Sequence, residues 1–174
     1  MGPAEKSEII DILEKSTADF QAAAGSIPEF LATIRPEADR WSVLECVEHV
    51  TTVEEIFLTR LAGGTPGETP PEDRDKEAML AKRLSDRSSR RQAPEAILPK
   101  GRFASLAQGL EEFHRVRARS MQFALDHAAD LYTLASSHPV LGPLNGMEAM
   151  IILAGHSSRH ADQIREVRAA LEKR

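Results

Sequence analysis

Apolar residues recur in four stretches of the chain at the three- and four-residue spacing of one helical face. The first stretch, from about 6 to 24, has its apolar positions at Ile9, Leu13, Phe20 and Ala24. Gly25 can end this helix, and Pro28 lies just beyond it. The third stretch runs from about 103 to 129 and has its apolar stripe at Leu106, Leu110, Phe113, Val116, Phe123 and Leu131.

The second and fourth stretches each begin with a capping box, in which two residues satisfy each other's unpaired backbone amides. Ser42 and Glu45 form one at the start of a helix that stops at residues 63–64, a pair of glycines. Asn145 and Glu148 form the other, and that helix runs to about residue 171. The sequence therefore predicts well-defined starts for both helices.

Strands have little support, because no stretch of Val, Ile or Thr alternates with polar residues and aromatic residues make only 5% of the chain. Residues 138–144 are expected to form a loop. Four helices of roughly 18 to 27 residues are typical of a four-helix bundle. We therefore expect an all-α fold, with residues 1–174 as a single four-helix-bundle domain that has long crossover connections; the links 25–40 and 63–100 can both cross a bundle end.

The connection 63–100 is rich in glycine, proline and charge. Between residues 72 and 91 only Met79, Leu80 and Leu84 are apolar anchors, so an extra charged loop, a short exposed helix or a flexible arm is expected there. A basic cluster lies within it, made of Lys82, Arg83, Arg87, Arg90 and Arg91. A solvated surface is the simpler interpretation, and a site for an anionic partner is the alternative.

Composition excludes several classes of protein. With 41% hydrophobic and 28% charged residues among 174, the chain is not disordered throughout. Cys46 is its single cysteine, which excludes an intrachain disulfide and a cysteine-based zinc site. The longest apolar run, residues 149–154, is too short to cross a membrane, and no secretion signal opens the chain. The net charge of −5 argues against nucleic acid. We expect a cytoplasmic protein with neither membrane nor nucleic acid as partner.

His156 and His160 are one helical turn apart, and both fall toward the apolar side of the last helix with Leu153 and Ile164. Two imidazoles so placed can share one metal ion, although the spacing alone is weak evidence. An unpaired buried imidazole costs about 1–3 kcal/mol, so a cation is a simple way to satisfy this pair. The alternative is a pair of core histidines bonded to carbonyls or water.

A metal site needs a third ligand. Among the other histidines, His49 is favoured because it lies within the body of the second helix, at the edge of its apolar arc. His127 is next. His114 falls on a charged shoulder and is expected to be exposed, and His138 precedes a proline in the predicted loop.

Three other residues near these positions invite a functional interpretation. Glu54 falls on the apolar face of its helix, either as an edge carboxylate whose head reaches water or as an acceptor or general base near an ion. Cys46 is expected to pack in the core and not to act as a nucleophile. Trp41 is expected to be a core or staple residue at a helix start, with the lining of a substrate cavity as the alternative.

The order of motifs resembles the DinB-like (DinB/YfiT-like) superfamily, metalloenzymes related to the damage-inducible DinB proteins of Bacillus. The resemblance covers nearly all of the chain. It lies in the helix start Trp41-Ser42-x-x-Glu45-x-x-x-His49, the segment Gly142-Pro143-Leu144, and the C-terminal run Gly155-His156-Ser157-Ser158-Arg159-His160-x-x-Gln163-Ile164.

The resemblance implies a four-helix bundle, often a homodimer. It also implies one divalent ion per chain, zinc, nickel or iron, held by three histidines that correspond to His49, His156 and His160. Related proteins include transferases and isomerases that use low-molecular-weight thiols such as bacillithiol or mycothiol. They often have an acid directly after the first histidine of the pair, where this chain has Ser157.

Three neutral histidines leave positions on an ion open, which is typical of a catalytic site. The leading hypothesis is therefore a metal-dependent enzyme, of the thiol S-transferase type, that acts on a small-molecule substrate; a metal-dependent hydrolase is its variant. The alternatives are a non-catalytic, stress-related metal-binding protein and a helical interaction protein whose histidines are only packed.

Overall fold

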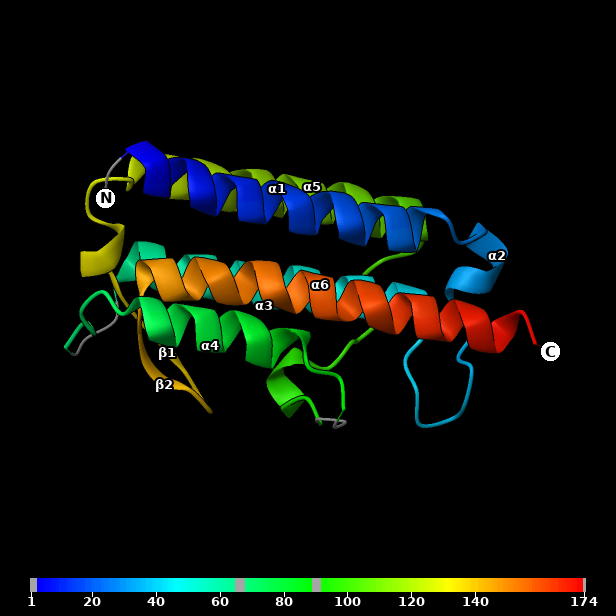
Figure 1. Cartoon of the computed structure of the whole chain (residues 1–174). Coiled ribbons are helices and arrows are strands. Elements are labelled where there is room, and N and C mark those ends of the chain that lie inside the picture. The colour runs from blue at the N-terminus through cyan, green and yellow to red at the C-terminus, as the bar shows by residue number, and fades with distance from the viewer. Residues whose placement is uncertain (1–2, 65–67, 89–91, 174) are drawn as a thin grey trace.

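The computed structural model describes residues 3–64, 68–88 and 92–173. In these residues the chain is mostly helical, as predicted (Figure 1). The elements in chain order are α1 (Pro3–Gly25), α2 (Glu29–Ala32), α3 (Val43–Gly63), α4 (Arg74–Ser85), the 3-10 turn η1 (Glu95–Ile97), α5 (Leu106–Asp126), the 3-10 turn η2 (Leu131–Thr133), β1 (Ala135–His138), β2 (Gly142–Asn145) and α6 (Gly146–Leu171).

The four long helices form a ring in the order α1, α6, α3, α5, in which each packs against its two neighbours. Figure 1 shows that α1 and α6 run in one direction, and that α3 and α5 run in the other. Because α3 and α5 are parallel neighbours, the chain must return along the bundle between them. The connection that contains α4 makes this return, so the long crossover expected from the sequence is confirmed.

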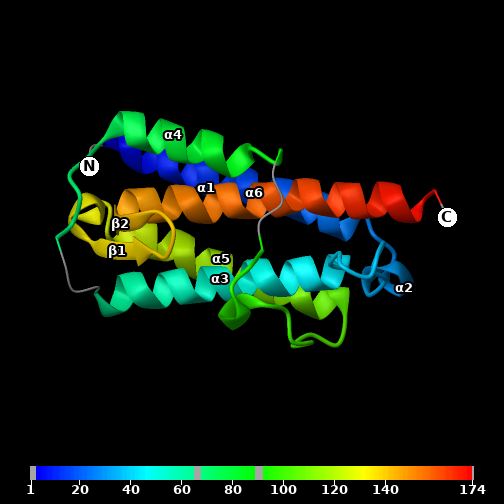
Figure 2. The same ribbon diagram turned by 90° about the horizontal axis from the view of Figure 1, so that it is seen from below.

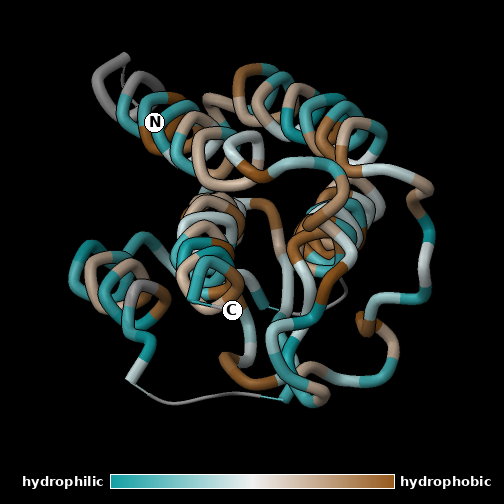
Figure 3. Tube along the Cα trace, turned by 90° about the vertical axis from the view of Figure 1, so that its right-hand side faces the viewer, coloured by the Kyte–Doolittle hydropathy of each residue, from teal (hydrophilic) through white to brown (hydrophobic). Residues whose placement is uncertain are grey.

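Helix α4 packs on the outside of α6, as the end-on view of Figure 3 and the view from below in Figure 2 both show. Its Leu80 is buried and enters the hydrophobic core. Lys76 also pairs with the buried Glu148 of α6, with 2.9 Å between Nζ and Oε1. The expected short helix in the charged segment is therefore present, and it is anchored to the helix that contains His156 and His160.

The sequence predicted no strands, and this prediction was wrong for residues 135–145. There β1 and β2 form an antiparallel hairpin, with Ser136 opposite Leu144. Both of these side chains are buried, and the hairpin packs against α3 and α6. Its strands, ASSH and GPLN, lack the alternation by which strands are recognised. Leu131, expected in the third helix, lies instead in η2, where it is fully buried.

The core consists of two hydrophobic clusters. One surrounds Leu13, Phe57 and Met150 near the hairpin, and the other surrounds Phe20, Val47 and Phe113. The rings of Phe20 and Phe113 lie 4.6 Å apart between centroids. Ser157 lies between the two clusters along α6, and Glu54 of α3 directly follows Val53 of the cluster near the hairpin; both are buried and polar. The interior of the bundle is therefore polar near its middle.

Candidate metal centre

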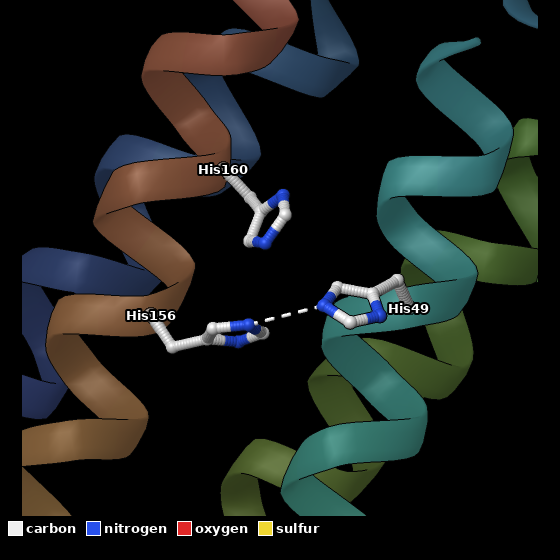
Figure 4. Close-up of side chains that lie close together, drawn as sticks. All are labelled: His49, His156 and His160. Atoms are coloured by element: carbon white, nitrogen blue, oxygen red, sulfur yellow. Dashed lines mark hydrogen bonds between the residues drawn. The ribbon is translucent and has the colours of Figure 1, made fainter. Parts of the chain in front are cut away.

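Helices α3 and α6 present His49, His156 and His160 to one another near the middle of the bundle (Figure 4). Both capping boxes predicted from the sequence are present at the starts of these helices. They fix the first turn of each helix and so the rotational setting of the residues that follow. His49 projects from α3, and the two histidines one turn apart on α6 project toward it.

The three imidazoles are close enough to share one ion. Nε2 of His49 lies 3.2 Å from Nε2 of His156. One nitrogen from each of the three rings lies within 4.8 Å of the others. The side chains of His49 and His160 are 4% and 7% exposed, while His156 is partly exposed. Two of the three histidines are thus buried, and His156 is partly buried.

Backbone chemistry fixes the tautomer of His49. Its Nδ1 lies 2.8 Å from the carbonyl oxygen of Ile97 in η1. A carbonyl oxygen can only accept a hydrogen bond, so Nδ1 carries the proton and Nε2 keeps its lone pair, which can accept a hydrogen bond from Nε2 of His156. That lone pair faces His156, as a metal ligand requires.

His160 has a buried ring nitrogen, Nδ1, with no hydrogen-bond partner among the described residues. Such an atom is costly to bury unpaired, by about 1–3 kcal/mol. A cation at the centre of the three rings would be bound by one nitrogen from each ring. The residues present therefore fit a divalent ion with nitrogen ligands.

Burial favours the neutral form of all three rings. Burial lowers the pKa of His49, and its hydrogen bond to Ile97 partly opposes this. Burial also lowers the pKa of His156 and of His160 well below the ordinary 6.5, and the neighbouring histidines and Arg159 act in the same direction. Neutral imidazole is the form that binds metal.

Trp41 lies against the histidine cluster. Its ring centroid is 4.7 Å from that of His49 and 6.1 Å from that of His160, with which it is nearly parallel. It also packs against the hydrophobic cluster around Val47. The core role of Trp41 is therefore confirmed, and the lining of a substrate cavity stays a prediction.

Cys46 is fully buried, and burial raises the pKa of its thiol. Its predicted packing role is confirmed.

The other three histidines lie outside the cluster. His114 is exposed, as predicted, and bonds Gln21. His127 caps α5 and contacts Asp130. His138 lies in β1 and not in a loop; it accepts hydrogen bonds from the backbone of the hairpin turn and lines a surface hollow beside the end of α3.

Glu54 does not reach water, which corrects the first interpretation of this residue. Its side chain is buried and forms two hydrogen bonds with Arg117, of 2.7 and 2.8 Å. Arg117 also donates to Ser157, 3.0 Å away, at the position where an acid was expected from the resemblance. Because Glu54 is committed to an arginine, it is poorly suited to act as a general base.

Sequence reasoning missed Glu48. Its buried carboxylate accepts hydrogen bonds from three successive backbone N–H groups, those of Lys100, Gly101 and Arg102. The only signal in the sequence is a charged residue directly before His49. Nothing in the sequence indicates that its partners are amides some 50 residues away.

The segment after α4 contacts α6 next to His160. Arg87 bonds both carboxylate oxygens of Glu166, at 2.9 and 2.7 Å, and the carbonyl of Arg159. Arg87, which belongs to the predicted basic cluster, thus forms an ion pair with another residue of the same chain. Arg90 and Arg91 lie outside the described residues. The anionic-partner alternative stays a prediction. None of the helices in the described part of the chain has the long apolar stretch that a bilayer crossing requires.

Comparison with known proteins agrees with this architecture. The protein named YfiT from Bacillus subtilis, described as a probable metal-dependent hydrolase with an unusual four-helix bundle topology, has a similar structure, with a TM-score of 0.64. The match covers 99% of this chain and 90% of that one at 16% identity. In sequence, the uncharacterized protein YuaE of Bacillus subtilis (strain 168) is 23% identical over 139 residues, which are 80% of this chain and 84% of YuaE.

The family model of the DinB superfamily matches residues 12–164, which include all three histidines of the cluster. The match begins in α1 and ends in α6, so it covers all four helices of the bundle. The chain therefore belongs to the DinB superfamily.

Proposed function

We propose that this protein is a metal-dependent enzyme that holds one divalent ion between His49, His156 and His160. The observation that carries the proposal is the convergence of three buried or partly buried imidazoles, with one nitrogen of each ring within 4.8 Å of the others.

An ion bound by three neutral histidines keeps positions open to substrate, and it lowers the pKa of a water or thiol placed there. The protein contributes the orientation. Ile97 holds His49 in the tautomer that aims a lone pair inward. The indole of Trp41 lies against the rings of His49 and His160. Zinc, nickel and iron all accept three imidazole ligands.

Within this class, the site favours transfer of a small thiol over hydrolysis. In that reaction the thiol loses its proton to solvent, its sulfur bonds to an electrophilic carbon, and the leaving group departs with its electron pair. No protein base is required. Hydrolysis commonly uses a carboxylate as general base, but the buried Glu48 and Glu54 are already committed to backbone amides and to Arg117.

A metal-dependent hydrolase is the second candidate. It is favoured by the structural similarity to YfiT, whose description names that activity. It needs no thiol, since water can occupy the open position. A third outcome, metal binding without catalysis, stays an alternative that only activity measurements separate from these two.

The first experiment is elemental analysis of protein purified without a histidine tag. We expect about one ion per chain in the wild type, and its loss in His156→Ala. His114→Ala is the matched control, because it removes an exposed histidine outside the cluster and is expected to keep the ion. No ion in the wild type, and no uptake of zinc, nickel or iron afterwards, would overturn the proposal.

The second experiment assigns the reaction. The metal-loaded wild type and His156→Ala are each given thiols with alkyl or epoxide electrophiles, and separately ester and amide substrates without thiol. Conjugation that requires both the thiol and His156 supports the transferase. Hydrolysis that requires His156 alone supports the hydrolase. A loaded protein that is inactive on both panels supports metal binding without catalysis.

A further inference from the structure

We infer that Glu48 is a positioning residue for the metal centre: by binding the backbone of residues 100–102, it holds the Ile97 carbonyl against His49. This inference rests on the proposed metal site. It adds a residue that does not touch the ion and a segment, here called the clamp segment, that runs from Glu95 to Arg102.

The contact between Glu48 and the clamp segment has the form of a built anion site. Its carboxylate oxygens receive N–H groups from Lys100 at 2.5 Å, and from Gly101 and Arg102 at 3.0 Å each. Gly101 has a φ of 78°, a left-handed conformation that turns successive amides toward one point. The Glu48 side chain is only 4% exposed, so water competes little for these bonds.

The second contact of the same segment is to the next residue along α3. Ile97, three residues before Lys100, accepts the Nδ1 proton of His49 at 2.8 Å. Two adjacent side chains of α3 therefore bind one short stretch of backbone, one through its amides and the other through a carbonyl. Because the stretch is short, the position of the Lys100 amide restricts where the Ile97 carbonyl can lie.

The consequence is a choice between the two tautomers of His49. With the Ile97 carbonyl in place, the proton stays on Nδ1 and the lone pair of Nε2 faces His156. If the clamp segment moves away, the proton can also reside on Nε2, where it blocks the ligand position. Glu48 thus acts on the cluster through Ile97, as outer-shell partners of metal-bound histidines commonly do.

The test compares Glu48→Gln with Glu55→Gln. Glu55 lies on the same helix and pairs with the side chain of Arg102, so its loss weakens a contact to the same segment without touching its backbone amides. The tautomer of His49 is read from its ring nitrogen shifts by NMR in metal-free protein above pH 7. Zinc affinity is measured separately by competition with a chelator.

We expect Glu48→Gln to populate the Nε2–H tautomer of His49 and to weaken zinc binding about 10-fold or more, within the range of outer-shell substitutions. Glu55→Gln is expected to leave both unchanged. A purely structural role would lower the melting temperature of Glu48→Gln but keep the wild-type tautomer and affinity. That result would overturn the inference.

A second variant covers the case in which Glu48→Gln does not fold. A Cβ at Gly101 meets no atom within 4 Å, so Gly101→Ala strains only the backbone of the clamp segment and keeps the carboxylate. It should shift the tautomer in the same direction, and an unchanged tautomer there would overturn the inference. The tautomer needs no metal, so a wild type that binds no zinc contradicts the proposed function separately from this result.

Discussion

The side chain of Arg117 is charged and fully buried, and each of its three nitrogen atoms donates hydrogen bonds to acceptors within the protein. Nε and Nη2 bind the two oxygens of Glu54, and Nη2 also reaches Ser157. Nη1 is surrounded by acceptors of α1, namely the Leu13 carbonyl and the hydroxyls of Ser16 and Thr17. One arginine of α5 therefore links the other three helices of the ring, and one of its contacts is the residue next to His156.

Removing one partner of the Glu54–Arg117 ion pair should lower the free energy of unfolding more than removing both partners. In Glu54→Leu the Arg117 charge stays buried without a counter-charge, and we expect a loss of about 3–5 kcal/mol in the free energy of unfolding. The double variant Glu54→Leu with Arg117→Met replaces both charges by apolar groups and should lose less than either single change. Equilibrium unfolding in urea measures all four proteins. A double variant whose loss equals the sum of the single losses would contradict this account.

The histidine cluster should make the metal-free protein sensitive to mild acid. The folded-state pKa values of its histidines lie below 6.5, so between those values and 6.5 the unfolded chain binds more protons than the folded one. The contribution of the neutral histidines to stability is therefore fully present above about pH 7 and is lost as the pH drops below 6.5. Urea unfolding in the presence of a chelator at pH 7.5, 6.5 and 5.5 measures the fall.

The control for this pH effect compares variants that lack histidines of the cluster with a variant that lacks an exposed histidine. A variant with His156→Ala and His160→Ala should lose less stability between pH 7.5 and 5.5 than the wild type. His114→Ala should follow the wild type, because that side chain is exposed. Equal slopes in all three proteins would assign the acid sensitivity to other groups.

At the scale of elements, the helices that carry the cluster were predictable because their signals are local. A capping box needs only residues three apart, and both boxes form as predicted. The hairpin was not predicted because its strands do not show an alternating pattern of apolar and polar residues. They are stabilised instead by pairing with each other and by the burial of Ser136 and Leu144.

The site follows the same division. His156 and His160 are a local pattern, and His49 could be chosen by its face of the helix. Glu48 and Arg117 could not be assigned, because their partners lie 40 or more residues away and include backbone groups that leave no mark on the sequence. Glu54 was noticed for its apolar surroundings, but only the fold shows the arginine that neutralises it.

The packing of α4 on α6 depends on one glycine. A Cβ at Gly155 would lie 2.8 Å from Cβ and Cδ1 of Leu84, so Gly155→Ala must push α4 away or displace Leu84. We expect a loss of about 1–3 kcal/mol, as for other overpacked sites. Gly63→Ala is the matched control, because its Cβ meets no atom within 4 Å and alanine favours a helix.

Urea unfolding of the two variants checks this prediction, and hydrogen exchange locates the effect. Exchange should accelerate in α4 and around residue 155 for Gly155→Ala, while Gly63→Ala stays at or above the wild-type stability. If Gly155→Ala were as stable as the wild type, the contact between Leu84 and α6 would not be tight in solution.

At the scale of the whole molecule, the order of the helices places the cluster between two pairs of parallel helices. α3 runs with α5, and α6 runs with α1, so an ion bound by His49 and the α6 pair would join the two parallel halves. The homodimer implied by the family resemblance stays a prediction, which light scattering of the purified protein can test.

Metal removal should therefore affect the stability of the entire bundle. An ion that binds only the folded chain, at a free concentration 100 times its dissociation constant, stabilises it by about 2.7 kcal/mol. For a chain of this size that amounts to roughly 5–10 °C in melting temperature. Calorimetry of the chelator-treated protein with and without zinc measures the shift.

His160→Ala should lose this shift because the ion then keeps ligands from only two rings, and His114→Ala should keep it. Because the ligands lie on both α3 and α6, zinc should also slow hydrogen exchange in both helices around the three histidines. Protection confined to α6 would place the ion on the pair His156 and His160 alone and remove His49 from the site. Protection of both helices, lost together in His160→Ala, is the result expected of one ion that links them.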